Sequence, residues 1–149
     1  MTDLREVCDV GYASGVFDMF HVGHLNLLRR ARAHCRQLVV GVASDEYVER
    51  LKGYPPVVPC DERIDIITAL GIVDQVVIDR DADKTLVWQQ IPFDVIFKGS
   101  DWEGTAKGYR LEAEMKAVGA KVVYFPYTRQ TSSSMLRTFL TDRNRRGKP

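Results

Sequence analysis

The sequence has 149 residues, of which 45% are apolar and 28% are charged, values typical of one globular domain with a single buried core. The 21 basic and 20 acidic residues leave a formal net charge of +1. Because no global basic field results, nucleic acid is not an expected partner. No apolar run approaches the ~20 residues that span a bilayer, which argues against a membrane partner as well.

The ends of the chain and its cysteines bear on its location. The first six residues are polar and partly acidic, unlike a signal peptide. Cysteines at positions 8, 35 and 60 lack CxxC spacing, which favours buried thiols over a disulfide framework or a zinc site. We therefore expect one cytoplasmic domain over residues 1–149, in which the charged stretch 142–149 forms a flexible tail.

Short runs rich in β-branched residues alternate with stretches of helical period. The runs predict strands at 7–12, 37–42, 75–79, 94–98 and 121–125, and their continuous apolar character is typical of strands buried on both faces of a parallel sheet. Helices are predicted around 25–35, over 61–70, 83–90 and 107–118, and from about Ser132. This alternation predicts an α/β fold: a Rossmann-like, doubly wound, parallel five-stranded sheet with helices on both faces. Ligands of such sheets bind at the carboxyl ends of the strands.

Two histidines, three residues apart, lie where the first predicted strand gives way to the first predicted helix. A loop that enters a helix offers free N–H groups and a positive dipole end to a phosphate, and Gly23 would let the backbone approach it. His21 and His24 could donate hydrogen bonds to the same anion. A lone histidine here would more often be a surface or capping residue, but this arrangement favours function. No metal ligand is expected, because His34 is the only other histidine and no third ligand stands at zinc spacing.

This segment resembles the HxGH signature of the nucleotidyltransferase superfamily. From about Val10 to Leu140 the chain resembles the glycerol-3-phosphate cytidylyltransferase family, whose members make CDP-alcohols. The family's Gly-Thr-Phe-Asp is Gly-Val-Phe-Asp at 15–18 here, so Val16 lacks a hydroxyl. The resemblance implies an acceptor contact from Asp18. For Phe17, the alternative to a contact with the ligand is packing in the core. It implies nucleotide contacts from Gly15, Val16, Phe17 and Gly23.

Two cations in the middle of the chain match family positions. Lys52 precedes Gly-Tyr-Pro-Pro, like the lysine of a mobile loop that reaches the triphosphate, and a compact ammonium suits that task. Arg63 matches a family arginine that contacts the acceptor's phosphate. The resemblance thus gives both residues catalytic and substrate-binding roles. The alternatives are a solvated lysine, and a surface arginine paired with Asp61 or Glu62.

The fourth predicted strand runs into Gly-Ser-Asp-Trp at 99–102, close to the family's Gly-Asp-Asp-Trp, and a carboxyl-end loop is where ligands are expected. Ser100 makes the local charge less negative than in the family. Asp101 is expected at the acceptor, with metal binding or an Asx-turn as alternatives. The resemblance implies nucleotide contacts from Asp94, Lys98, Gly99 and Trp102. The alternatives are a place in the structural core for Asp94 and an interface or core aromatic for Trp102.

Hydroxyl side chains begin the last predicted helix. Such a start can cap itself and still bind phosphate, because its orphan N–H groups exceed what one cap satisfies. The family's motif here is Arg-Thr-x-Gly-Ile-Ser-Thr-Thr, and its arginine aligns with Tyr127. Arg129 could then supply the guanidinium instead. The substitution leaves the choice of base open. The resemblance implies nucleotide contacts from Tyr127, Thr128, Arg129, Ser132 and Ser133.

The resemblance implies an enzyme that transfers CMP from CTP to a polyol phosphate such as glycerol 3-phosphate and releases pyrophosphate. It also implies a homodimer, and Mg²⁺ would be held mainly by the triphosphate. The alternative is an adenylyltransferase that uses ATP on a sugar phosphate or another phosphorylated small molecule. A non-catalytic nucleotide-binding module is a third possibility, against which the intact histidine pair argues.

Overall fold

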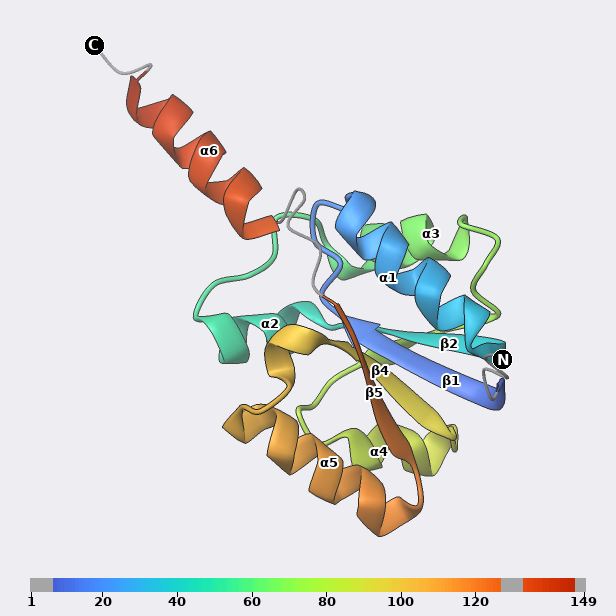
Figure 1. The fold of residues 1–149 in the computed structure, drawn as a ribbon. Coiled ribbons are helices and arrows are strands. Elements are labelled where there is room, and N and C mark those ends of the chain that lie inside the picture. Colours follow the sequence, from blue (N-terminus) through green and yellow to red (C-terminus); the bar gives the residue numbers. More distant parts are fainter. Residues whose placement is uncertain (1–6, 127–132, 147–149) are drawn as a thin grey trace.

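The computed structural model describes residues 7–126 and 133–146, which form a parallel sheet covered by helices (Figure 1). The strands follow the order β3-β2-β1-β4-β5, and each adjacent pair is parallel. The predicted Rossmann-like doubly wound fold is therefore confirmed. The strands are β1 (Cys8–Gly15), β2 (Cys35–Ala43), β3 (Gln75–Asp79), β4 (Val95–Gly99) and β5 (Lys121–Phe125).

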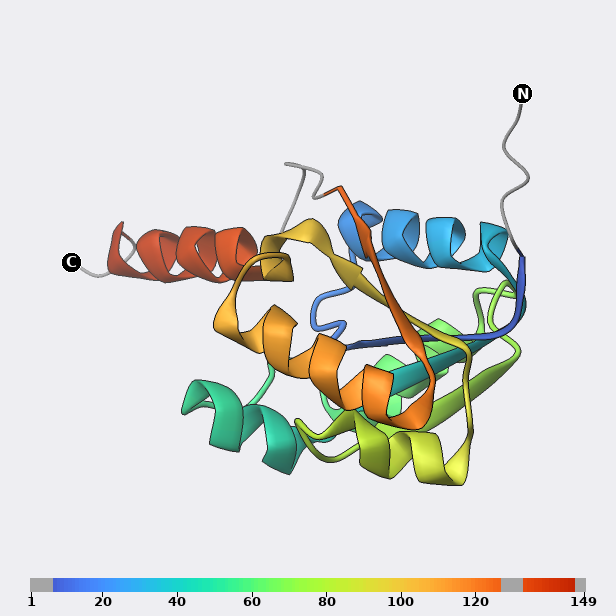
Figure 2. The ribbon, with the colours of Figure 1, turned by 60° about the horizontal axis from the view of Figure 1, so that its bottom comes forward.

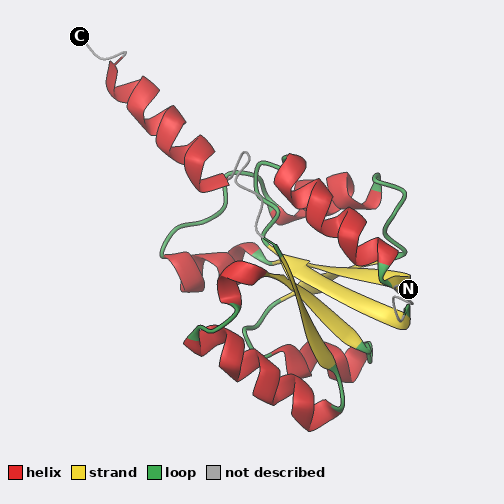
Figure 3. Cartoon of the chain, viewed as in Figure 1, coloured by secondary structure: helices red, strands yellow, loops and turns green. Residues whose placement is uncertain are grey.

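Helices cover both faces of the sheet (Figures 2 and 3). They are α1 (Val22–Ala33), α2 (Asp45–Lys52), α3 (Cys60–Thr68), α4 (Lys84–Gln90), α5 (Ala106–Val118) and α6 (Ser133–Arg146), with a 3₁₀ turn η1 (Ser100–Trp102) after β4. The sequence analysis missed α2. Its start is a Ser44 cap whose hydroxyl accepts from the Tyr47 N–H at 3.1 Å, as helix N-termini prefer.

Two apolar layers hold the helices to the sheet. On one face Leu28 of α1 and Ile67 of α3 are fully buried in a cluster with strand residues such as Val40. On the other face Leu111 and Met115 of α5 pack in a second cluster with residues of the central strands. Because both faces of the sheet are covered, the stretch Leu38–Ala43 of the central strand β2 is buried and carries no charged side chain.

The direction of strand addition reverses at β1, since β2 and β3 lie on one side of it and β4 and β5 on the other. Ligands of doubly wound sheets bind in the crevice at this switch point, outside the carboxyl ends of the strands. That crevice lies beside Gly15 and Gly99, the last residues of β1 and β4.

A side-chain bridge crosses three strands near this edge. The Tyr12 hydroxyl on β1 donates to the Asp79 carboxylate at the end of β3, at 3.0 Å. Between them lies Gly41 on β2, where a Cβ would overlap the Tyr12 hydroxyl. The glycine therefore leaves the space that the bridge needs.

The last helix, α6, extends away from the sheet (Figures 1 and 2). Ser133 and Arg137 at its start bond to Asp18, while Met135, Phe139 and Leu140 are exposed. A flexible tail was predicted from residue 142, but α6 continues as a helix to Arg146. No described helix combines the length and the apolar character that crossing a bilayer requires.

We predict that Gly41→Ala lowers the free energy of unfolding by about 2 kcal/mol or more, because overpacking forces the buried Tyr12 ring to move. Urea unfolding at pH 7 measures this. The control is Gly53→Asn at the left-handed cap of α2, where the added side chain meets open space and asparagine tolerates the conformation. Equal stability of Gly41→Ala and the parent protein would contradict the steric argument.

Candidate active site

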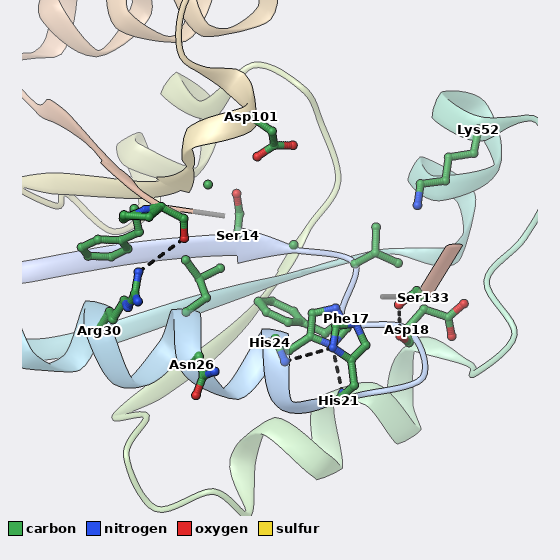
Figure 4. Close-up of a pocket in the computed structure, with 17 residues that line it drawn as sticks. Ser14, Phe17, Asp18, His21, His24, Asn26, Arg30, Lys52, Asp101 and Ser133 are labelled. Atoms are coloured by element: carbon green, nitrogen blue, oxygen red, sulfur yellow. Dashed lines mark hydrogen bonds between the residues drawn. The ribbon is translucent and has the colours of Figure 1, made fainter. Parts of the chain in front are cut away.

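A cavity of about 430 Å³, here called the histidine cavity, opens at the switch point between β1 and the start of α1 (Figure 4). Lys52 extends toward it from the end of α2 (Figure 4). The structure brings together eleven of the residues predicted for the site. They are Gly15, Val16, Phe17, Asp18, His21, Gly23, His24, Lys52, Gly99, Asp101 and Ser133.

The two histidines form a reciprocal capping box at the start of α1. The Gly23 N–H donates to Nδ1 of His21 at 3.1 Å, and the His21 N–H donates to Nδ1 of His24 at 3.3 Å. The rings stack with centroids 3.8 Å apart and an interplanar angle of 26°. Gly23 was expected to bring its backbone to a phosphate, but its N–H is taken by the ring of His21. The imidazoles replace these N–H groups as the donors available to a ligand.

The bonds at Nδ1 also fix the protonation of the rings. A nitrogen that accepts a backbone N–H carries no proton, so each neutral imidazole bears its proton on Nε2. Burial lowers the pKa of His21, and burial together with the neighbouring His21 lowers the pKa of His24 to about 4. At neutral pH the pair therefore offers two uncharged N–H donors that can bind one phosphoryl group.

The loop between β1 and α1 holds an unusual backbone conformation. Phe17 and Met19 adopt φ values of 54° and 48°, which cost a non-glycine residue about 1 kcal/mol or more each. The Asp18 carboxylate anchors the loop by accepting the N–H groups of Val57 and Val58, both at 2.8 Å, and by pairing with Arg137. Asp18 is 2% exposed, so this carboxylate positions the loop rather than the acceptor, a correction to the predicted role.

The predicted role of Arg63 also requires correction. Arg63 is 1% exposed, and it lines neither the histidine cavity nor the second cavity that adjoins it. It donates to the carbonyl groups of Val58, Val16 and Ala43 at 2.7–2.8 Å and to the Asp45 carboxylate at 2.5 Å. With its N–H groups so engaged, Arg63 clamps the β1–α1 loop to β2 and α2. It is a positioning residue and does not reach an acceptor phosphate.

A second cavity of about 560 Å³ adjoins the first and is here called the lysine cavity. The ends of β1 and β4 line both, through Ser14, Gly15 and Gly99. Lys98 and Trp102, which were expected at the nucleotide, line the lysine cavity and not the histidine cavity. The Lys98 ammonium lies 4.4 Å from the centre of the Trp102 ring and donates to the Ser14 hydroxyl at 3.1 Å.

Of the five remaining predicted residues, the structure describes only Asp94, and it places Asp94 elsewhere. Asp94 precedes β4 at the amino end of the sheet, where its carboxylate accepts the Val10 N–H at 2.9 Å. It therefore lies at the opposite edge from the histidines, and a nucleotide contact is ruled out by strand polarity. The other four, Tyr127, Thr128, Arg129 and Ser132, lie outside the described residues.

Sequence reasoning missed a buried ion pair beside the lysine cavity. Lys84 at the start of α4 donates to the Asp79 carboxylate at 2.6 Å, and both side chains are at most 5% exposed. The only signal in the sequence was that Asp79 ends a predicted strand. Asn26 and Arg30, on the face of α1 that lines the histidine cavity, were missed as well. Within the described ranges, no three His, Cys, Asp or Glu side chains form a metal-binding cluster.

The sequence profile of the cytidylyltransferase-like family matches residues 12–139. The chain belongs to this family. The predicted membership in the nucleotidyltransferase superfamily is thereby confirmed, and with it the class of enzyme.

Two individual relatives of this cytidylyltransferase-like chain differ in how much of their length it matches. It is 35% identical over 116 residues to FAD synthase from Pyrococcus abyssi, covering 76% of this chain and 77% of that enzyme. It is 42% identical over 97 residues to the bifunctional protein HldE from Hyphomonas neptunium, covering 62% of this chain but only 19% of HldE. The chain thus matches about a fifth of the length of that relative.

Solved structures agree on the fold. A lipopolysaccharide core biosynthesis protein from Thermoplasma volcanium matches with a TM-score of 0.68 and 25% identity, over 83% of this chain and 99% of that one. A pantoate-beta-alanine ligase from Francisella tularensis has a TM-score of 0.62 at 14% identity, over 88% of this chain and 65% of that one. The second likeness shows the fold alone.

The lowered pKa of His24 predicts how stability depends on pH in this cytidylyltransferase-like domain. Its value of about 4 in the folded protein lies below the ordinary value near 6.5. As pH falls from about 6.5 toward 4, the unfolded chain binds a proton that the folded chain does not. Stability is therefore lost at up to about 1.4 kcal/mol per pH unit. We expect urea unfolding at pH 7 and pH 5 to show a drop that shrinks by about 2 kcal/mol in His24→Gln.

His21→Gln tests the same reasoning with a smaller shift. Its pKa is lowered by burial alone, so the drop between pH 7 and pH 5 should shrink in the same direction but by less. An unchanged pH dependence in His24→Gln would show that the ring is not held neutral by the fold.

Arg63→Lys distinguishes a clamp from a substrate ligand. A single ammonium cannot replace four bonds in diverging directions, so we expect the free energy of unfolding to fall by about 2 kcal/mol or more. Arg50→Lys is the matched control, because Arg50 is an exposed residue whose guanidinium donates to the Arg80 carbonyl and lies over the Tyr47 ring. A raised acceptor KM in Arg63→Lys with unchanged stability would restore the substrate-binding role.

Proposed function

We propose that this chain transfers a nucleotidyl group from an NTP to the phosphate of a small alcohol or sugar and releases pyrophosphate. The observation that carries the proposal is the stacked pair of neutral Nε2–H donors at the histidine cavity. In-line displacement at a phosphorus requires positioning and stabilisation of charge more than covalent help. An acceptor phosphate is already ionised, so no side chain has to act as a base.

The proposed step balances without a protein nucleophile. An oxygen of the acceptor's phosphate forms a bond to the α-phosphorus of the NTP, and the bond from that phosphorus to the bridging oxygen of the β-phosphate breaks. His21 and His24 would bind the non-bridging oxygens of the α-phosphate, where negative charge builds up in the transition state. Lys52 would hold the outgoing phosphates, since it is an exposed ammonium at the cavity. Ser133 would add its hydroxyl at the same wall.

ATP is the donor that we place first. FAD is the product named for the Pyrococcus abyssi relative. In FAD an adenylyl group is joined directly to a ribityl phosphate by a P–O–P bond, so its synthesis by this reaction would use ATP. The sequence prediction of CTP and glycerol 3-phosphate rests on the resemblance from about Val10 to Leu140, and stays a prediction. The residues expected to contact the base lie mainly in 127–132, outside the described chain. Mg²⁺ would enter with the triphosphate, and the predicted homodimer also stays a prediction.

The test is pyrophosphate release from ATP, CTP, GTP and UTP in the presence of pooled phosphorylated sugars and alcohols. We expect one NTP to be preferred, and His21→Gln and His24→Gln each to lower kcat by about 10²–10³-fold, the loss typical of one transition-state donor. His34→Gln is the control, because His34 is the C-cap at the far end of α1, where its Nδ1 lies 2.8 Å from the Arg30 carbonyl oxygen. Near-normal product formation by either cavity variant would exclude the assignment.

A further inference from the structure

The two cavities meet along a shared wall, which suits an enzyme that must bring two substrates together. Ser14, Gly15, Gly99 and Asp101 line both of them. The histidines line only the histidine cavity, whereas Lys84, Lys98 and Trp102 line only the lysine cavity. If the α-phosphate of an NTP binds at the histidines, a group in the lysine cavity reaches it across the ends of β1 and β4.

Lys98 is a partly buried cation that lines the lysine cavity. The Lys98 ammonium contacts a neutral hydroxyl, that of Ser14, and the face of the Trp102 ring. Over residues 7–126 and 133–146, no carboxylate forms an ion pair with its ammonium within 4 Å. Enclosing a cation without an ion-pair partner is costly. Burial and the neighbouring Lys84 ammonium lower the pKa of Lys98 to about 8, and the carboxylates of Asp79 and Asp101 oppose this shift only in part. A bound anion would supply the missing charge.

The lysine cavity also holds a pair of charged side chains that balance each other and lie near enough to Lys98 to influence its pKa. There the Lys84 ammonium and the Asp79 carboxylate neutralise each other at 2.6 Å, and the Tyr12 hydroxyl also donates to that carboxylate. A neutral pair does not attract a second phosphate. It does present a donor and an acceptor side by side, which is what vicinal hydroxyl groups can bind.

We propose that the lysine cavity is the acceptor site, that Lys98 binds the acceptor's phosphate, and that the Asp79–Lys84 pair binds hydroxyl groups of a sugar-sized body. This inference rests on the proposed nucleotidyl transfer. The proposal places the attacking phosphate oxygen beside Ser14, at the wall that the two cavities share, here called the Ser14 wall, between Lys98 and the histidines. A volume of about 560 Å³ is within the range of pockets that enclose drug-sized ligands, and a three-carbon alcohol phosphate would leave most of it empty. The acceptor class is therefore a sugar phosphate rather than glycerol 3-phosphate.

Calorimetric binding tests the cavity without relying on turnover. Glucose 1-phosphate, ribose 5-phosphate, glycerol 3-phosphate and unphosphorylated glucose are titrated into the full chain, and the NTP is titrated separately. We expect Lys98→Met to raise the Kd of the sugar phosphates about ten-fold or more, because a charge-assisted hydrogen bond is lost. The Kd of the NTP should change less than about two-fold. Lys116→Met, on the exposed face of α5, is the matched control, since Lys116 lines neither cavity.

The Asp79→Asn/Lys84→Gln double variant tests the proposed binding of hydroxyl groups by this pair. Both charges are removed together, so no buried charge is left unpaired. We expect the preference for sugar phosphates over glycerol 3-phosphate to disappear while the remaining affinity for phosphate stays. Thermal unfolding confirms that the variant is folded, and the ligand panel on the parent chain remains decisive if it is not.

The outcomes separate this inference from the proposed function. Sugar phosphates that bind through Lys98 while no NTP yields pyrophosphate would leave the acceptor site standing and remove the transfer reaction. The inference is overturned if Lys98→Met weakens the NTP instead of the sugar phosphates. It is also overturned if glycerol 3-phosphate or flavin mononucleotide binds the parent chain about ten-fold more tightly than every sugar phosphate.

Discussion

The chemistry of this site depends on two hydrogen bonds from backbone N–H groups to imidazole Nδ1 atoms. They join His21 and His24 to the first turn of α1 and hold the stacked rings in one orientation. The same bonds place the ring protons on Nε2. The usual orphan donors of a helix start are thus exchanged for imidazole donors that reach farther from the backbone. In the proposed function, a helix terminus that would bind any anion becomes one that holds a phosphoryl group in one orientation.

That arrangement is maintained by a loop under strain and by the contacts that oppose it. The left-handed residues Phe17 and Met19 can persist only because their neighbours are held on both sides. Arg63 holds the Val16 carbonyl from one side, and Asp18 accepts two backbone N–H groups from the segment before α3 on the other. Asp18 also pairs with Arg137 of α6. The loop therefore couples α1 to α2, α3 and α6, so the histidines and Lys52 are positioned by one connected set of contacts.

Local pattern predicted the strands well, because β-branched runs buried on both faces are visible without knowledge of their partners. β3 and β5 begin and end where the sequence placed them. The short helix α2 was missed because its signal is one cap. Arg63 was misassigned because its burial depends on hydrogen-bond acceptors from Val16, Ala43 and Asp45, which precede it in the chain by 47, 20 and 18 residues. The error at Asp94 was avoidable: it begins a predicted strand, and only the carboxyl ends of parallel strands face the ligand crevice.

The two cavities differ in the kind of charge that they offer, and this difference suits their proposed tasks. Neutral imidazole donors bind a ground-state phosphate weakly, but their hydrogen bonds strengthen as negative charge grows on the α-phosphate. They therefore favour the transition state over the bound substrate. Lys98, a cation without an ion-pair partner among the described residues, on the other side of the Ser14 wall, suits a group whose charge is already present before reaction. Uniform binding of that group lowers KM and orients the attacking oxygen. The switch point between β1 and β4 thus brings a site specialised for rate next to one specialised for affinity, and the fold requires only that both strands end at the same edge.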